Sequence, residues 1–572
     1  MNTIKIQILT GFCILGLGIL SSCKDSIPIE DAGRFTEDYV WQTPSLSRGV
    51  LLLAYGSMPT YYHNYGISGE FLEIATDDAT SSNNGSTIRS FATGMLSPAN
   101  NGLDSWTTSY NKIKGLNAFL LHGFSGQLYI KDAATNQKFY RRYKGEALTM
   151  RAWLAFDLLK NYGGLVGGKA TGVPIVTTVI TDEEAFRLQR ASYADCVSQI
   201  VADCDSAIKI TDFPDNYTGT DVVTGSTWYG AASKNVARVI KTMAYLHAAS
   251  PANNRDNNTA LWDSTARNAM VAIKAIDGLP NANALPVRDF YTVDGNVDVI
   301  WSSPANSATS FVYETANLPP SLRGNGITNP SQELVDAFYD SKGYPINHIS
   351  ATYNPQDPYN GRDPRLKQFI LCNGMTYSGQ TIATYDGGTD APGSSADATK
   401  TGYYLLKFLS PNAVLYPETK NGKASYVARM SKTNLYLIFA EAMNELAGPD
   451  DKRYGLSAKE ALGKIRKRAG FVLDPYMNSF TSDQKVEFRK LIHNERRVEL
   501  CFEGYRFWDL RRWEEPLNTN VSRAKITLTN GVLSYSSPVV IEKKLFNSSF
   551  MPLPLSETII IPGIKQNDGW SN

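Results

Sequence analysis

Hydrophobic positions recur every three or four residues in two stretches of the chain, from about 104 to 250 and from about 430 to 513. In the first stretch, the apolar residues between Phe139 and Leu158 follow this step, and charged residues occupy the other faces. The spacing predicts an amphipathic helix of about five turns that ends at the Gly-Gly pair 163–164. The same periodicity predicts helices over 106–120, 187–208, 233–249 and 435–446.

Two more helices in the second stretch are predicted from their first turns. Ser457-Ala-Lys-Glu460 and Thr481-Ser-Asp-Gln484 both have the capping-box pattern, in which a hydroxyl accepts a hydrogen bond from the third amide and the third side chain returns one. Helix pairs that bury one face against the next pair are typical of tetratricopeptide-like units. A clean repeat of about 34 residues is not visible, so the spacing favours such units without identifying them.

The stretch between the two helical parts is different in composition. Residues 251–430 are rich in Gly, Asn, Pro, Ser, Asp and Tyr and contain few helical runs. So much loop inside a compact protein is typically functional. We divide the chain into a leader (1–22), an N-terminal helical region (23–250), a loop-rich central insert (251–430) and a C-terminal helical region (431–572), all within one globular unit.

The first 22 residues have the pattern of an export signal. A Lys precedes an almost wholly apolar run from Ile8 to Leu20, which is short for a membrane span and ends in the string LSSC at Cys23. This ending is typical of a bacterial lipobox, in which the Cys receives a diacylglyceryl group after cleavage. The alternative is an ordinary cysteine behind an ordinary cleaved signal. We expect Cys23 to be lipidated and its acyl chains to hold the protein at a membrane.

Charge and composition exclude some classes of function. The chain has 56 Lys plus Arg against 55 Asp plus Glu and a pI near 7.5, so it lacks the basic field of a nucleic-acid-binding protein. Its 31 Tyr, 44 Gly and 27 Pro indicate loops that carry amphipathic rings, which favours ligand binding.

The cysteines do not form an obvious disulfide framework. Cys196 and Cys204 lie on one predicted helix, about 12 Å apart along its axis, which is too far for a bridge. Cys372 and Cys501 would meet only through the fold. We expect Cys196 and Cys204 to be buried thiols, and the Cys and His spacing does not suggest a metal site.

Catalytic motifs are missing from the sequence. It has five His residues and no HExxH, GxSxG or phosphate-binding glycine loop in a strand–turn–helix context. A glycosidase would need two carboxylates at a defined separation across a cleft, and the adjacent pair Asp77-Asp78 points its side chains in different directions. We therefore predict no catalytic residue, no cofactor and no enzymatic activity.

The most specific string is NERRVELCFEGYRFWDLRRW at 494–513, where Glu495, Glu499 and Glu503 stand four residues apart. Stacked glutamates repel one another unless cations neutralise them. We interpret them as part of a structural network, because arginines and aromatic rings of the same string lie within one or two turns. These arginines are Arg496, Arg497, Arg506, Arg511 and Arg512.

This string resembles the closing signature of the SusD/RagB family, the outer-membrane nutrient-binding lipoproteins of Bacteroidetes. The resemblance covers essentially the whole chain, because further segments occur in the family order. They are the lipobox at Cys23, WTTSYNKIKGLNAFL at 106–120, EALTMRAWLAFDLLKNYGG at 146–164 with GVPIV at 172–176, NPSQELVDAFYDSKG at 329–343, RDPRL at 362–366, TGYYLLKF at 401–408, LYLIFAEAMNELAG at 435–448, KIRKRAG ending at Gly470, and PLPLSE and QNDGW near the end.

The resemblance implies a mainly α-helical fold, in which four tetratricopeptide-like helix pairs form a scaffold that carries an irregular, loop-rich region with short strands. It also implies a location at the cell outer membrane, anchored through acylated Cys23 and surface-exposed. Members of the family bind an oligosaccharide, or peptides in RagB-like branches, and act as the lid of a SusC-like TonB-dependent transporter. They are generally not enzymes.

Candidate ligand residues follow from side-chain chemistry, because a sugar site needs flat rings for stacking and amides, carboxylates or guanidinium groups for hydroxyls. Such residues gather in 61–91 and 301–325, roughly the parts of the chain that hold ligand in the family. For Trp301, packing in the core is an equal alternative, and for Asp77 a turn or helix-cap role is the alternative. The candidates are Tyr65, Asp77, Asp78, Asn83, Asn84, Trp301, Phe311, Tyr313 and Asn325.

Three functions are compatible with these observations. The leading prediction is a glycan-binding lipoprotein that delivers oligosaccharides to a SusC-like transporter. The alternative is the same architecture capturing peptides, which would favour backbone hydrogen bonding and a wider cleft. A surface glycoside hydrolase is the third, and the lack of a suitable carboxylate pair argues against it.

Overall fold

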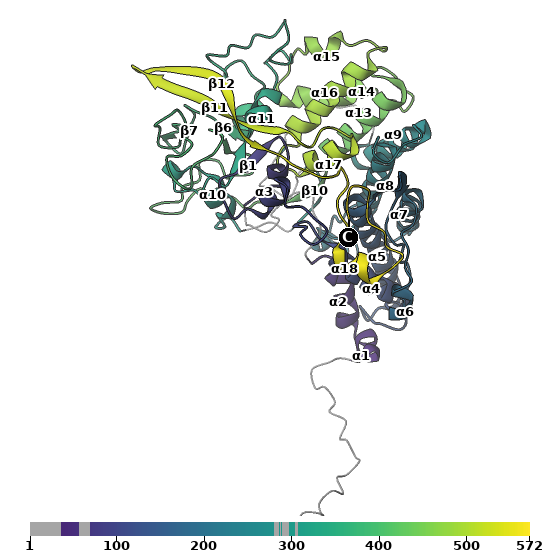
Figure 1. The fold of residues 1–572 in the computed structure, drawn as a ribbon. Helices are drawn as coiled ribbons and strands as arrows, with labels where there is room; N and C mark the ends of the chain where they lie inside the picture. The colour runs from purple at the N-terminus through teal and green to yellow at the C-terminus, as the bar shows by residue number, and fades with distance from the viewer. Residues whose placement is uncertain are drawn as a thin grey trace, which may run out of the picture.

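The computed structural model describes residues 36–56, 69–278, 285, 288, 297–303 and 307–571. These residues form 18 α-helices and six two-stranded antiparallel sheets, so the fold is mainly α-helical as predicted. Figure 1 shows a column of helices that widens into a head, from which one long β-hairpin projects. Cys23 and Tyr65 lie outside the described residues.

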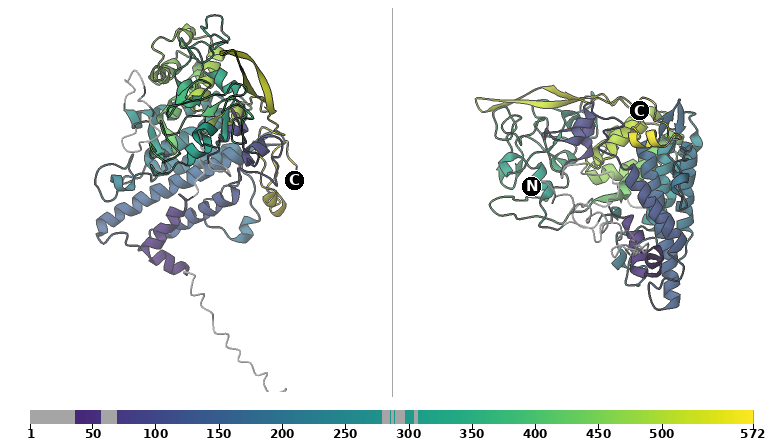
Figure 2. Two further views of the ribbon diagram at one scale, coloured as in Figure 1. Left: turned by 90° about the vertical axis from the view of Figure 1, so that its left-hand side faces the viewer. Right: turned by 60° about the horizontal axis from the view of Figure 1, so that its bottom comes forward.

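The scaffold is a succession of helices in which each one packs on the next. This succession runs from α4 to α13, and α13 also contacts α14 and α16, so that the N-terminal and C-terminal helical regions form one array. Figure 2 shows this array along one side of the molecule and the loop-rich part along the other. In order, the helices are α4 (Trp106–His122), α5 (Ala133–Tyr162), α7 (Tyr193–Ile208), α8 (Lys234–Ala249), α9 (Thr259–Asp277), α13 (Lys432–Ala447), α14 (Ala458–Ala469) and α16 (Lys485–Glu499).

Shorter helices and strands complete the described part of the chain. The remaining helices are α1 (Glu37–Gln42), α2 (Pro44–Leu53), α3 (Thr87–Ala92), α6 (Asp182–Ala185), α10 (Val312–Asn317), α11 (Gln332–Ala337), α12 (Arg365–Phe369), α15 (Pro475–Ser479), α17 (Tyr505–Arg512) and α18 (Leu555–Ile560). The strand pairs are β1 (Ala79–Ser81) with β5 (Thr328–Pro330), β2 (Gly164–Val166) with β3 (Lys169–Thr171), β4 (Val299–Ser302) with β10 (Ala428–Ser431), β6 (Ile370–Leu371) with β9 (Tyr404–Leu405), β7 (Thr376–Tyr377) with β8 (Gln380–Thr381), and β11 (Asn520–Thr529) with β12 (Val532–Lys543).

Most predicted helices are present, with shifted starts. Helix α5 ends at Tyr162 as predicted, and α14 opens with the predicted capping box, in which Glu460 N donates to Ser457 Oγ at 3.1 Å and Ser457 N to Glu460 Oε2 at 3.0 Å. The second capping box is wrong as a helix start. Gln484 Oε1 accepts from Thr481 N at 2.9 Å, but helix α16 begins one residue after Gln484.

Helix α9 is the largest departure from prediction, because it lies at the start of the segment that composition assigns to loop. Its 19 residues pack between α8 and α13 and join the two helical regions. The chain then leaves the scaffold after Asp277 and returns at Lys432. Lys432 Nζ forms an ion pair with Asp277, and Tyr436 Oη donates to Asp277 Oδ2 at 3.2 Å, which holds the two ends of the insert together.

The string 494–513 forms the end of α16, a tight turn and α17, and its three glutamates are at most 2% exposed. Their structural role is as expected, but their partners are not the neighbouring arginines. They come from other segments, namely helices α12 and α14 and the insert. Glu495 and Glu499 pair with Arg365, Glu495 with Arg466 at 2.9 Å, Glu499 with Arg468 at 2.7 Å, and Glu503 with Arg288 and with Lys407 at 2.8 Å.

Other predicted packing residues are buried as expected. Trp106, Trp153, Trp508 and Trp513 are at most 8% exposed, and the four cysteines of the described chain are buried free thiols. A membrane-spanning helix is not found among the described residues, where each helix is too short or too polar for that purpose.

Candidate functional site

The two stretches predicted to hold ligand are neighbours in the fold. Strand β1 pairs with β5, and beyond the pair Ser82 Oγ donates to the carbonyl oxygen of Gly326 at 2.8 Å. This contact brings Asn83 and Asn84 next to Asn325. Asn84 and Asn325 are exposed and Asn83 is half-buried, so their amides can reach a ligand from solvent.

Asp77 and Asp78 are placed differently, because both are buried between β1 and the α16–α17 turn. Arg497 Nε donates to Asp78 Oδ1 at 2.6 Å, and Arg506 Nη2 donates to Asp77 Oδ2 at 2.9 Å. Burial raises the pKa of Asp77, but Arg497 and Arg506 outweigh it and hold the pKa below its usual value. These aspartates join the N-terminal strand to the C-terminal helices, and we leave them out of the proposed ligand surface.

Trp301 also lies in the core, where it is 2% exposed. Its Nε1 donates to the carbonyl oxygen of Gly230 at 2.8 Å, and its ring meets Trp153 edge-on with centroids 5.5 Å apart. It borders a cleft of about 230 Å³, but the exposed ring there belongs to Tyr229, which is 47% exposed and was not predicted. The arrangement favours the packing alternative for Trp301.

Phe311 and Tyr313 stand at the start of α10 and are half-buried. The Tyr313 ring packs 6.1 Å from that of Phe71, and burial raises the pKa of Tyr313 to about 12. Nearby along the chain, the guanidinium of Arg323 lies 5.3 Å from the ring centre of Tyr416, which is 67% exposed. Tyr416 was not among the predicted residues, and its signal in the sequence is a Tyr-Pro step followed by a polar turn.

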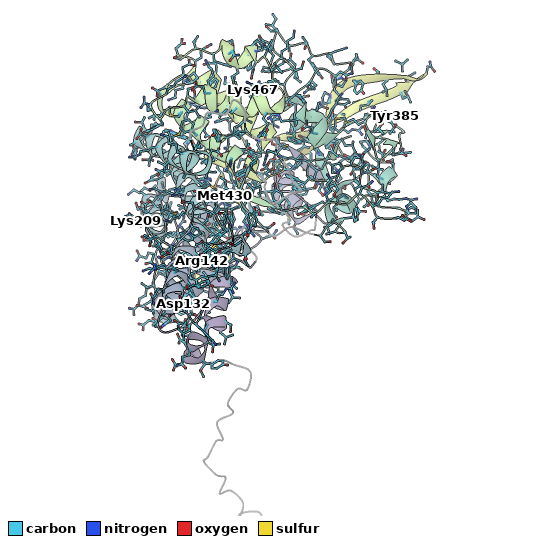
Figure 3. The ribbon with its side chains drawn as sticks, turned by 180° about the vertical axis from the view of Figure 1, so that it is seen from behind. Asp132, Arg142, Lys209, Tyr385, Met430 and Lys467 are labelled. Carbon is cyan, nitrogen blue, oxygen red and sulfur yellow. The ribbon has the colours of Figure 1, made fainter. Side chains whose placement is uncertain are left out.

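The largest cleft among those described has a volume of about 460 Å³, which lies in the usual range for ligand pockets. It opens between the end of β1, helix α3, the loop 392–400 and the base of the β11–β12 hairpin; Figure 3 marks Tyr385 on the side of the head near this hairpin. We call it the polar cleft, because eight of its thirteen lining residues are polar or charged. The polar residues that line it are Ser82, Asn84, Arg89, Ser395, Thr399, Lys400, Arg523 and Glu542.

Glu542 is the centre of the ion pairs in the polar cleft. Arg89 Nε donates to Glu542 Oε2 at 2.5 Å, and Lys544 Nζ donates to Glu542 Oε1 at 2.6 Å from the buried side. Burial alone would raise the pKa of Glu542, but Lys544 and Arg89 lower it below the usual value. The carboxylate is therefore ionised and fixed in place at neutral pH.

Comparison with known proteins gives consistent matches. A model of the SusD family matches residues 291–570, and a second model, described as starch-binding and associating with the outer membrane, matches residues 55–240. The SusD-like protein P38 of Formosa agariphila is 22% identical over 537 residues, which cover 90% of this chain and 92% of that protein.

Solved structures share the fold over nearly the whole chain. A SusD-like protein of Bacteroides fragilis aligns with a TM-score of 0.70 at 22% identity, covering 94% of this chain and 99% of the other. A SusD-like carbohydrate-binding protein of the same species gives 0.68 at 20% identity, with 92% and 100% covered. A laminarin-binding SusD-like protein gives 0.58 at 18% identity, with 92% and 99% covered.

Proposed function

Because the chain belongs to the SusD/RagB family, we propose that it captures an oligosaccharide at the cell surface and delivers it to a SusC-like TonB-dependent transporter. The observation that supports glycan capture most directly is the exposed loop surface beside the polar cleft. There, amides, guanidinium groups and one exposed ring lie on neighbouring segments, which is the combination that sugar recognition uses.

Each group has a definite part in this proposal. Asn84 and Asn325 exchange hydrogen bonds with sugar hydroxyls, Arg323 donates to ring or hydroxyl oxygens, and the ring of Tyr416 stacks on an apolar sugar face. Asn83, Phe311 and Tyr313 border this surface with partly exposed side chains. Tyr65, outside the described residues, remains a proposed contact.

We propose a binding role without a catalytic step. Among the described residues that line the polar cleft, Glu542 is the one carboxylate, and Arg89 and Lys544 already engage it. A glycosidase would need a second carboxylate across the cleft. The proposed acyl anchor at Cys23 keeps the binding protein close to the transporter, which raises its effective concentration there.

Peptide capture is the second candidate. It is favoured by the polar cleft, whose lining contains charged side chains. The described residues that line this cleft include no aromatic residue. Isothermal titration of the mature protein against neutral glycans, acidic glycans and an oligopeptide mixture separates the candidates. We expect heat from at least one glycan; heat from peptides alone would establish the alternative, and turnover of a glycan would contradict the binding role.

Replacing Tyr416 with Ala is expected to weaken glycan binding about fivefold, because stacking on an exposed ring contributes on the order of 1 kcal/mol. The melting temperature should stay unchanged, since the ring is 67% exposed. Tyr39→Ala is the matched control, because Tyr39 is 51% exposed on α1, at the far end of the helical column (Figure 1). Equal affinities of both variants and the parent protein would remove Tyr416 from the site.

A further inference from the structure

The charges around the polar cleft are unbalanced. Arg89 and Lys544 share Glu542, and two more cations, Lys400 and Arg523, line the same cleft. Within the described part of the chain, neither the Lys400 ammonium nor the Arg523 guanidinium has an ion-pair or hydrogen-bond partner. Three cations therefore line the cleft with one carboxylate, and buried Lys544 adds a fourth positive charge behind that carboxylate, in a chain whose formal net charge is only +1.

Nearby carboxylates do not neutralise the excess positive charge of the polar cleft. Next to Arg523 on β11, the backbone N of Ser522 donates to Glu333 Oε2 at 2.9 Å, and Glu333 does not line the cleft. Asp397 belongs to the loop 392–400 but does not line the cleft. Burial lowers the pKa of Lys400, and repulsion from Arg89 and Lys544 lowers it further, partly opposed by Glu542.

An excess of cations in an open cleft attracts an anionic ligand group, because the ligand relieves the repulsion between them. Arg523 presents a planar fork that matches a carboxylate or sulfate with two hydrogen bonds, and Lys400 adds a compact charge. Asn84, on the rim, supplies an amide for an adjacent hydroxyl.

Resting on the proposed glycan-binding function, we propose that the polar cleft selects acidic glycans by binding a carboxylate or sulfate group through Lys400 and Arg523. The neutral hydroxyls of the same glycan contact Asn84 and the surface that carries Arg323, Asn325 and Tyr416. The ligand class is thereby narrowed from oligosaccharides in general to those that carry a negative charge.

Titration calorimetry with matched pairs of probes tests this proposal. Oligogalacturonides and their methyl esters differ in the carboxylate, and sulfated and desulfated carrageenan oligosaccharides differ in the sulfate. We expect at least tenfold tighter binding of the charged member in one of the pairs, and weaker binding as NaCl rises from about 50 to 300 mM. The pair that shows the difference identifies the anionic group.

The double variant Lys400→Gln/Arg523→Gln should lose this preference, with at least a tenfold rise in Kd for the charged probe and an unchanged melting temperature. Lys543→Gln is the matched control, because Lys543 is exposed on the same hairpin and does not line the cleft. If Lys543→Gln lost affinity for the charged probe to the same extent, the effect would come from the overall charge. The proposal that Lys400 and Arg523 form the binding site would then be wrong.

The other outcomes separate the two proposals. If neutral glycans bind at least as well as charged ones and the double variant binds them normally, the acidic-ligand proposal fails and glycan capture stands. If acidic oligopeptides bind through Lys400 and Arg523 while no glycan binds, the anion-binding site is supported and the proposed glycan-binding function is contradicted. If no probe of any class binds, both proposals fail.

Discussion

Glu499→Gln is expected to lower the free energy of unfolding by about 3–5 kcal/mol, the range measured when one partner of a buried ion pair is removed. Glu499 is 2% exposed, and its carboxylate accepts hydrogen bonds from Arg365 Nη1 and Arg468 Nη2, each at 2.7 Å. An amide of the same size removes one counter-charge from this buried network, although Arg365 keeps its pairs with Asp363 and Glu495. Chemical denaturation of the parent and variant proteins gives the difference directly.

The control for this prediction is an exposed pair of similar geometry. Arg187 Nη2 lies 2.5 Å from Glu183 Oε1, and both side chains are 75% exposed. Glu183→Gln should therefore change the free energy of unfolding by less than about 1 kcal/mol. Similar small losses in both variants would contradict the view that the buried network stabilises the junction between insert and scaffold.

The same carboxylate gives a pH dependence with a definite sign. Burial raises the pKa of Glu499, but Arg468, Arg365 and Arg288 outweigh it and lower the pKa from 4.5 to about 2. A carboxyl with a lowered pKa in the folded state adds stability above its unfolded pKa and loses it as pH falls through the folded value. The stability gap between the parent protein and Glu499→Gln should be constant above about pH 5 and narrow towards pH 2.

Trp301→Ala is expected to cost about 3–5 kcal/mol of folding free energy, as large-to-small changes in a packed core do. The indole loses its contact with Trp153, and the carbonyl oxygen of Gly230 loses its donor. Thermal unfolding of the variant should show a clearly lowered midpoint.

Tyr229→Ala is the matched control for Trp301→Ala, because Tyr229 borders the same cleft with a ring that is 47% exposed. Its melting temperature should remain close to that of the parent protein. A Trp301→Ala variant that folded normally but lost its ligand would support the other interpretation of this residue, direct stacking on a sugar.

The scaffold could be predicted where apolar side chains are large and regularly spaced, as along α5. Helix α9 could not, because three of its seven buried residues are the small alanines Ala266, Ala269 and Ala272, and an Asn-rich loop precedes it. The β11–β12 hairpin was missed although its Asn530-Gly531 turn, with φ of 51° and 78°, is a strong local hairpin signal.

The candidate site was predicted less completely, because burial depends on partners that are distant in sequence. Asp77 and Trp301 have suitable chemistry for a ligand, but Arg506 and Trp153 hold them inside the protein. Conversely, Lys400 and Arg523 became candidates only once the fold brought them to Asn84 and Glu542. Residue type and region gave a set of candidates, and side-chain contacts decided which of them face solvent.

The ion pair between Asp277 and Lys432 has a consequence for how the loops of this protein can change in evolution. Both ends of the insert meet at one point of the helical array, and Arg288, Arg365 and Lys407 attach the insert to the buried glutamates of 494–513. Because closing a longer loop costs only about 0.6 kcal/mol per doubling of its length, segments between these attachments can gain or lose residues cheaply. The segments 307–325 and 408–427 lie between them, so their exposed residues can change while the buried attachments and the stability that they contribute are retained.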